Sequence, residues 1–73
     1  MPSVTGDEAI SAFGKVGFVL DRIRGSHHIL KRAGHPYALS VPVHGKKTLK
    51  TGTLRSLIRD AGLTVEEFES LLD

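Results

Sequence analysis

The sequence predicts a small two-layer α+β domain with the order helix, three antiparallel strands, helix and short helix. Three observations support this prediction. Apolar residues recur at helical spacing near both ends, they alternate with polar residues in the middle, and short turns separate the middle segments. The chain has 73 residues, so we expect one domain over residues 1–73. Three strands have one face to cover, and only the helices can cover it.

Two signals define the expected first helix, residues 6–16. Thr5 and Glu8 have the spacing of a capping box, in which the hydroxyl caps the first amides and the carboxylate reaches back to the Thr5 amide. Apolar residues then recur at helical spacing. Gly17 follows as a residue that can take the left-handed conformation at the end of a helix.

The middle of the chain reads as a meander of three short strands. The expected strands are residues 18–24, 27–32 and 37–43. Gly25 and Ser26 form the first turn signal, and residues 33–36 form the second. Pro42 is expected at the end or the edge of the third strand, because proline cannot donate to the ladder.

The C-terminal part predicts two further helices. The first covers residues 51–62, with Thr51 as its cap and Gly62 at its end. Its apolar face consists of Leu54, Leu57, Ile58 and Ala61. A short last helix begins at Thr64 with a second capping box, and its apolar stripe is Phe68, Leu71 and Leu72.

Charge is distributed unevenly along the chain. The formal net charge is only +2, yet nine of the ten Lys and Arg residues and all four histidines lie between Arg22 and Arg59, an interval without Asp or Glu. A segment with one sign of charge suits a polyanionic partner. The alternative is an ordinary solvated basic face.

Composition excludes several classes of protein. Without cysteine there is no disulfide framework and no cysteine-ligated zinc site, which is compatible with a reducing cytoplasm. No leader is recognisable, and no apolar run approaches the ~20 residues of a membrane span. We therefore expect a cytoplasmic protein with no membrane contact.

The adjacent histidines His27 and His28 are the first candidates for chemistry. Neighbours on a strand point to opposite faces, so one ring is expected near the core and the other on display. This geometry disfavours a metal site built from the pair, and we expect neither a metal nor another cofactor. The sequence also lacks the motifs of a nucleophilic triad and of a paired-carboxylate hydrolase.

RNA cleavage requires few catalytic groups from a protein, because RNA carries its own nucleophile, the 2′-hydroxyl. Histidine can take that proton near neutral pH, and Lys or Arg can stabilise the charge that grows on the phosphate. The segment around His27 supplies these groups: Arg22, Arg24, Gly25, Ser26 and Lys31.

A second basic segment precedes the expected helix at residue 51. A helix start with free amides and small residues can bind an anion, and here lysines come just before it. The residues concerned are Lys46, Lys47, Lys50, Thr51 and Gly52. The alternative is an ordinary helix start with solubilising lysines. Next to a histidine-bearing strand, the phosphate-binding interpretation is preferred.

Several motifs together resemble the HicA (YcfA-like) family of type II toxins. They are Gly17-Phe18, Arg24-Gly25-Ser26-His27, Val41-Pro42-Val43-His44, Leu49-Lys50-Thr51-Gly52-Thr53-Leu54 and the segment from Asp60 to Phe68. Each motif alone is weak, but their order is specific, and they cover nearly the whole chain.

The resemblance implies a double-stranded-RNA-binding-domain-like fold and a metal-independent endoribonuclease, an mRNA interferase that arrests translation. It implies that the histidine of the Gly-Ser-His motif, here His27 and not His28, is the catalytic base. It also implies a HicB antitoxin that covers the active site and through which the pair binds its promoter DNA.

Some roles stay open at this point. The general acid could be His44, or His44 could be a loop histidine bonded to backbone groups. Lys31 or Lys46 could instead stabilise the leaving oxygen, and His35 is expected to be a bystander. Tyr37 is not expected to stack on a base. Two other functions fit the charge pattern: a non-catalytic RNA-binding module, and an interaction domain whose basic face binds an acidic protein.

Overall fold

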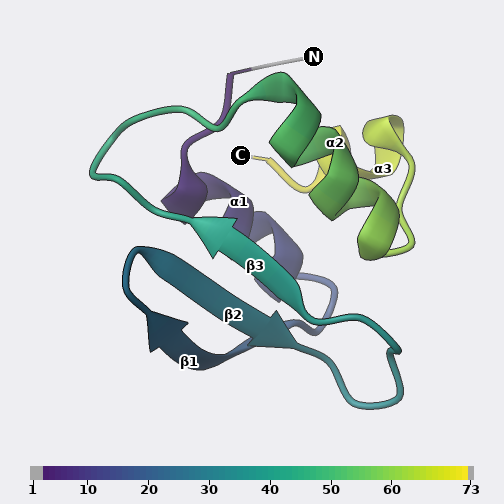
Figure 1. The fold of residues 1–73 in the computed structure, drawn as a ribbon. Coiled ribbons are helices and arrows are strands. Elements are labelled where there is room, and N and C mark those ends of the chain that lie inside the picture. The colour runs from purple at the N-terminus through teal and green to yellow at the C-terminus, as the bar shows by residue number, and fades with distance from the viewer. Residues whose placement is uncertain (1–2, 73) are drawn as a thin grey trace.

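The computed structural model, which describes residues 3–72, contains three helices and three strands (Figure 1). In chain order these are α1 (Gly6–Gly14), β1 (Val19–Arg24), β2 (His27–Lys31), β3 (Leu39–Pro42), α2 (Thr51–Asp60) and α3 (Val65–Ser70). The predicted fold class and element order are confirmed. Several elements are shorter than predicted: α1 ends at Gly14, α2 ends at Asp60 and β3 begins at Leu39, while β1 and β2 each differ by a single residue.

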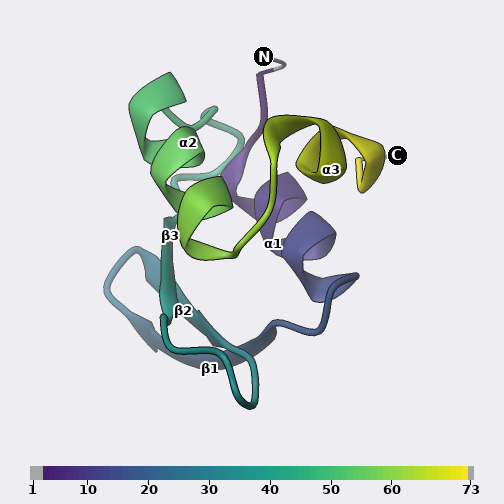
Figure 2. The same cartoon turned by 90° about the vertical axis from the view of Figure 1, so that its right-hand side faces the viewer.

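The three strands form one antiparallel sheet in the order β1-β2-β3. Leu30 of β2 pairs with Leu20 and Leu39, and His28 pairs with Ile23 and Val41. Both α1 and α2 pack against β3, and Figure 2 shows all three helices on the same side of the sheet, with β1 at the far edge. The fold therefore has two layers, and the other face of the sheet is open.

The core lies between the helices and the sheet. Phe13 of α1 is fully buried, and its ring centroid lies 5.2 Å from that of Phe68 and 6.1 Å from that of Phe18. Leu39 and Val41 contribute the buried side chains of β3. The predicted apolar face of α2 is buried at Leu54, Leu57, Ile58 and Ala61.

Helix ends follow the sequence signals at α1 and α3 but not at α2. Both capping boxes form, and Gly17 and Gly62 have positive φ angles of 97° and 80° after α1 and α2. The prediction that Thr51 caps α2 is wrong, because Thr51 is already helical and Lys50 occupies the N-cap position. Lysine has no side-chain acceptor, and in the described part of the chain no side-chain hydrogen bond caps this helix start.

A β-bulge in β1 determines which side chains share a face. Leu20 pairs with Leu30 while Arg22 pairs with Ile29, so Asp21 is an extra residue in the ladder. Paired residues point to the same side of a sheet. Leu20 and Ile23 therefore both face the helix side, and Arg22 lies on the open face.

Close packing between α1 and the end of β3 predicts a clear cost for Gly6→Ala. Gly6 is buried, and a Cβ atom there would collide with the Pro42 carbonyl oxygen and lie 2.9 Å from the Val43 Cγ2 atom. We expect a loss of about 1–3 kcal/mol in the free energy of unfolding, as for other overpacked sites.

The matched control is Gly14→Ala in the same helix, where a Cβ atom would meet nothing within 4 Å. Because alanine has the higher helix propensity, this variant should gain up to about 1 kcal/mol. Urea unfolding of both variants measures the difference, and an equal effect at the two positions would contradict the packing of α1 on β3.

Candidate nucleic-acid interface

The open face of the sheet brings together the charged side chains predicted around His27. Across the strands, His27 pairs with Arg24 and Pro42, and Arg22 pairs with Ile29. These side chains therefore point away from the helices. His27, Arg22 and Arg24 are all exposed. We call this group, together with Lys31 on the same face, the basic face.

His27 is held at the start of β2 by the local backbone. The turn before it contains Gly25, whose φ of 58° lies in the left-handed region that glycine favours. The carbonyl of Ser26 accepts a hydrogen bond of 2.8 Å from the backbone N–H of Val43. This bond ties the His27 turn to the segment after β3, where His44 is the next residue.

One carboxylate lies on the basic face. Asp21, the bulge residue, is 2.7 Å from the Arg22 guanidinium and 3.5 Å from the Lys31 ammonium. Exposed pairs of this kind contribute about 0–1 kcal/mol to stability. Within residues 3–72, no carboxylate hydrogen-bonds to His27 and none pairs with Arg24, so both remain available to a ligand.

A pocket of about 300 Å³ lies between the segment after β3 and the first turn of α2. Its lining residues are Pro42, His44, Lys47, Thr48, Leu49, Lys50 and Thr53. Pro42 is the cross-strand partner of His27, so the pocket adjoins the basic face. Lys46, Thr51 and Gly52 are exposed nearby but do not line it.

Four of the lining residues are not among the RNA-contacting candidates chosen from the sequence. Pro42, Thr48, Leu49 and Thr53 carry no charge, although Thr48 and Leu49 are sequence neighbours of Lys47 and Lys50. Leu49 offered one signal, because it is an isolated apolar residue in a basic segment. The N–H of Leu49 bonds to the Val4 carbonyl at 2.7 Å, which fixes one wall of the pocket.

His28 points to the helix side of the sheet. Its cross-strand partner Val41 is fully buried, and the His28 ring is half-buried. Its Nδ1 atom is buried without a hydrogen-bond partner in the described part of the chain. The prediction that the two rings lie on opposite faces is therefore confirmed, and His27 is the one displayed.

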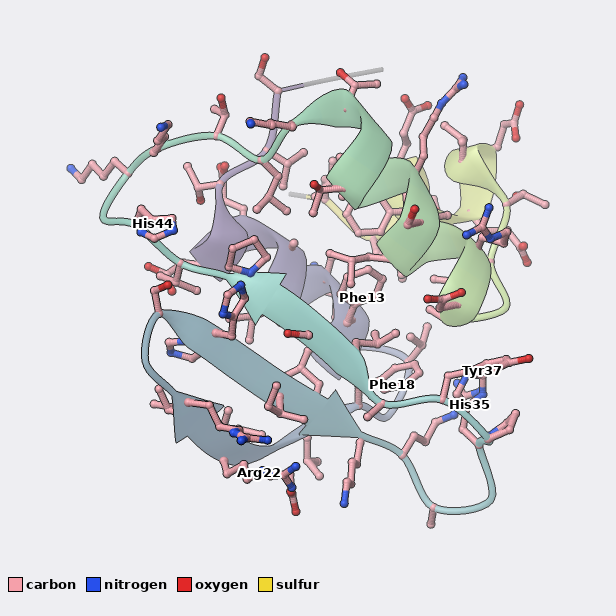
Figure 3. All side chains as sticks on the ribbon, viewed as in Figure 1. Phe13, Phe18, Arg22, His35, Tyr37 and His44 are labelled. Carbon is pink, nitrogen blue, oxygen red and sulfur yellow. The ribbon has the colours of Figure 1, made fainter. Side chains whose placement is uncertain are left out.

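His35 has a structural role at the other end of the molecule. Figure 3 shows His35 and Tyr37 together at the opposite end from His44. The Arg32 guanidinium donates to His35 Nδ1 at 3.0 Å, and His35 Nε2 donates to the Asp60 carbonyl at 2.6 Å. Since arginine cannot accept, the proton of the neutral ring is on Nε2.

Arg32 extends this connection to the first helix. Its guanidinium also donates to the Val16 carbonyl at 3.0 Å and lies 4.7 Å from the ring centroid of Phe18. Together with the His35 bonds, these contacts join the ends of α1, β2 and α2. The side chain of His35 is thus held by structural contacts and lies at the other end of the molecule from His44.

Two further properties follow from the placement of side chains over residues 3–72. No three His, Asp or Glu side chains in this range are grouped closely enough to hold a metal ion. No helix in the range is long and apolar enough to cross a membrane.

A family model described as the HicA toxin of bacterial toxin-antitoxin matches residues 6–63. The chain belongs to the HicA toxin family. The matched segment of this HicA-family protein contains α1, the whole sheet and α2, and so includes the basic face and the pocket. No curated protein matches the chain. Membership in this family makes the chain a toxin of a toxin–antitoxin pair, with an antitoxin as its partner.

Proposed function

We propose that this HicA-family toxin is a metal-independent endoribonuclease that cleaves mRNA and arrests translation, with His27 as its general base. One observation carries the proposal. In a chain of this toxin family, His27 is exposed at the start of β2, beside Arg22 and Arg24 on a face that no helix of residues 3–72 covers.

The proposed reaction uses the 2′-hydroxyl of the substrate as nucleophile. His27 takes the proton of the 2′-hydroxyl, and the 2′-oxygen attacks the adjacent phosphorus. The bond from phosphorus to the 5′-oxygen breaks, and a general acid protonates that oxygen. The products are a 2′,3′-cyclic phosphate and a 5′-hydroxyl end. The Arg24 guanidinium stabilises the charge on the phosphate oxygens.

His44 is the best-placed candidate for the general acid. It follows Val43, whose N–H is bonded to Ser26 in the turn before His27. Lys31 is four residues further along β2, about 13 Å away at the rise of a strand. Lys31 is also engaged with Asp21. Lys46 does not line the pocket beside His27's partner Pro42.

The reaction type is tested with the parent protein in EDTA. We expect cleavage of a single-stranded RNA to give 5′-hydroxyl ends, and we expect no cleavage of the same sequence as 2′-O-methyl RNA or as DNA. Cleavage of the DNA, or an absolute requirement for added divalent metal, would refute the proposed mechanism.

The pocket supports a role in holding the RNA backbone, because Lys47 and Lys50 lie on its wall. A variant with both Lys47→Ala and Lys50→Ala should bind RNA more weakly. The affinity falls as salt rises, and each phosphate contact contributes about −0.7 to the slope of log affinity against log salt for a single strand. Loss of two contacts should therefore make this slope less steep by about 1.4.

The matched control removes the same charge from within α2, outside the pocket. Arg55 and Arg59 are exposed on this helix but do not line the pocket. With Arg55→Ala and Arg59→Ala together, the salt slope should stay close to that of the parent. Equal slopes for the two double variants would show that net charge alone, and not the pocket, holds the RNA.

A non-catalytic RNA-binding module is the second candidate. The observation that favours it is that no carboxylate of the described residues orients His27. It predicts salt-dependent binding that ignores His27 and yields no cleavage product. An interaction domain for an acidic protein would instead bind RNA negligibly.

The cellular setting belongs to the same proposal. We take the antitoxin to be of the HicB type and to cover the basic face, with promoter DNA contacted only through it. The toxin would act on mRNA in the cytoplasm, as part of a stress response. No additional cofactor enters this proposal.

A further inference from the structure

Exposed apolar side chains are concentrated on one strand. Of the four large apolar side chains exposed among residues 3–72, three are on β1: Val19 (65 % exposed), Leu20 (51 %) and Ile23 (54 %). In a small domain such a cluster indicates an interaction site rather than random exposure. Val19 pairs with Lys31 and therefore lies on the open face, whereas Leu20 and Ile23 share the helix side of the strand.

The bulge at Asp21 gives β1 two chemically different sides. Leu20 and Ile23 point to the helix side of the sheet, but α1 and α2 pack on β3 and leave them uncovered. Arg22 and Arg24 point to the open face. A partner segment with alternating side chains would meet apolar groups on one side and cations on the other.

The main chain of β1 also lacks a partner on its outer side. β1 is the first strand of the sheet, and only β2 pairs with it within the described residues. Unpaired N–H and C=O groups on an edge strand are a template for another strand. The opposite edge is different, because β3 ends in Pro42 and is contacted by two helices.

The charges decide which strand fits. Two copies of β1 side by side would place Arg22 and Arg24 of both copies on one face, and like charges opposite one another destabilise a strand pair. Acidic side chains at alternate positions would instead pair with these arginines. Since the toxin family implies an antitoxin partner, the antitoxin can supply a segment with acidic side chains at alternate positions.

We propose that β1 is the docking edge for an extended acidic segment of the antitoxin, which joins the sheet as a fourth strand. Its apolar residues cover Leu20 and Ile23, and its acidic residues pair with Arg22 and Arg24. Arg24 is the cross-strand neighbour of His27, so the added strand would also compete with RNA for part of the basic face. The inference rests on family membership and not on the ribonuclease proposal.

The test uses the full-length protein and two synthetic peptides of equal length. In one, valine alternates with glutamate, and in the other, valine alternates with lysine. We expect the glutamate peptide to bind at least about tenfold more tightly. On binding, hydrogen exchange of the β1 amides should slow, while exchange of the α2 amides should not change.

Two neutral substitutions test the position of the binding edge. Ile23→Asn should weaken binding of the glutamate peptide about tenfold, because the apolar contact is lost. Tyr37→Asn is the matched control, since Tyr37 is the fourth exposed apolar side chain and lies outside β1; it should bind like the parent.

Three results would overturn the inference. They are equal affinity for both peptides, exchange protection outside β1, and a dimer of the free protein that Ile23→Asn abolishes. Protection of the β1 amides is measured on the parent, so the test remains decisive if a variant fails to fold. No step measures RNA cleavage, so failure here and failure of the ribonuclease proposal are distinguishable.

Discussion

Replacing Phe13 by alanine is expected to remove a large part of the domain's stability. The ring is fully buried and packs against both Phe18 and Phe68. Such a truncation costs about 3–5 kcal/mol, because apolar contacts are lost and a cavity remains. A domain of this length has a total free energy of unfolding of about 4–11 kcal/mol. We therefore expect a partly or fully unfolded protein.

Thermal and urea unfolding, followed by circular dichroism, measure this effect. Tyr37→Ala is the matched control, because this aromatic side chain is mostly exposed. Its loss should cost less than about 1 kcal/mol, as for other surface positions. A similar loss for both variants would contradict a core centred on Phe13.

The largest expected effect on activity is that of His27→Ala. Removing a general base typically lowers the rate about 100- to 10,000-fold. His27 is exposed and no hydrogen bond within residues 3–72 uses its ring, so its removal should leave the fold intact. Initial rates of RNA cleavage by folded samples give the ratio directly.

His28→Ala is the control for this experiment. His28 is the adjacent residue, but its ring lies on the helix side and its Nδ1 atom is buried. We expect cleavage within about threefold of the parent, which is less than 1 kcal/mol in the barrier. If His28→Ala lost as much activity as His27→Ala, the assignment by the Gly-Ser-His motif would fail.

Elements set by local interactions could be predicted from the sequence. The capping boxes at Thr5 and Thr64 and the stop at Gly17 depend on residues within a few positions of one another. The regular part of α1 ends earlier than predicted because its last turn tightens. The N–H groups of Lys15 and Val16 bond three residues back, to Ala12 and Phe13.

The bulge in β1 and the short length of β3 depend on tertiary contacts and could not be predicted from the sequence. Simple alternation would place Asp21 and Ile23 on the same face, but the bulge puts Ile23 on the helix side with Leu20. The third strand is shorter than predicted because β2 ends at Lys31. The next residue, Arg32, turns instead to the Val16 carbonyl and His35.

The candidate site also contains residues that could be chosen from the sequence and residues that only the folded structure brings together. His27 and the arginines of β1 could be chosen from charge and motif, because one hairpin carries them all. Of the pocket, only His44, Lys47 and Lys50 could be chosen in this way; its shape depends on how the end of β3, the segment after it and the first turn of α2 come together. The structural role of His35 depends on the Asp60 carbonyl, 25 residues away.

The central claim is that His27 performs the chemistry while other groups hold the RNA. Its most direct test is to measure RNA binding and RNA cleavage on the same folded His27→Ala sample, in EDTA. We expect that cleavage is lost and that affinity is kept. Cleavage at the parental rate would contradict it, and so would loss of binding together with loss of cleavage.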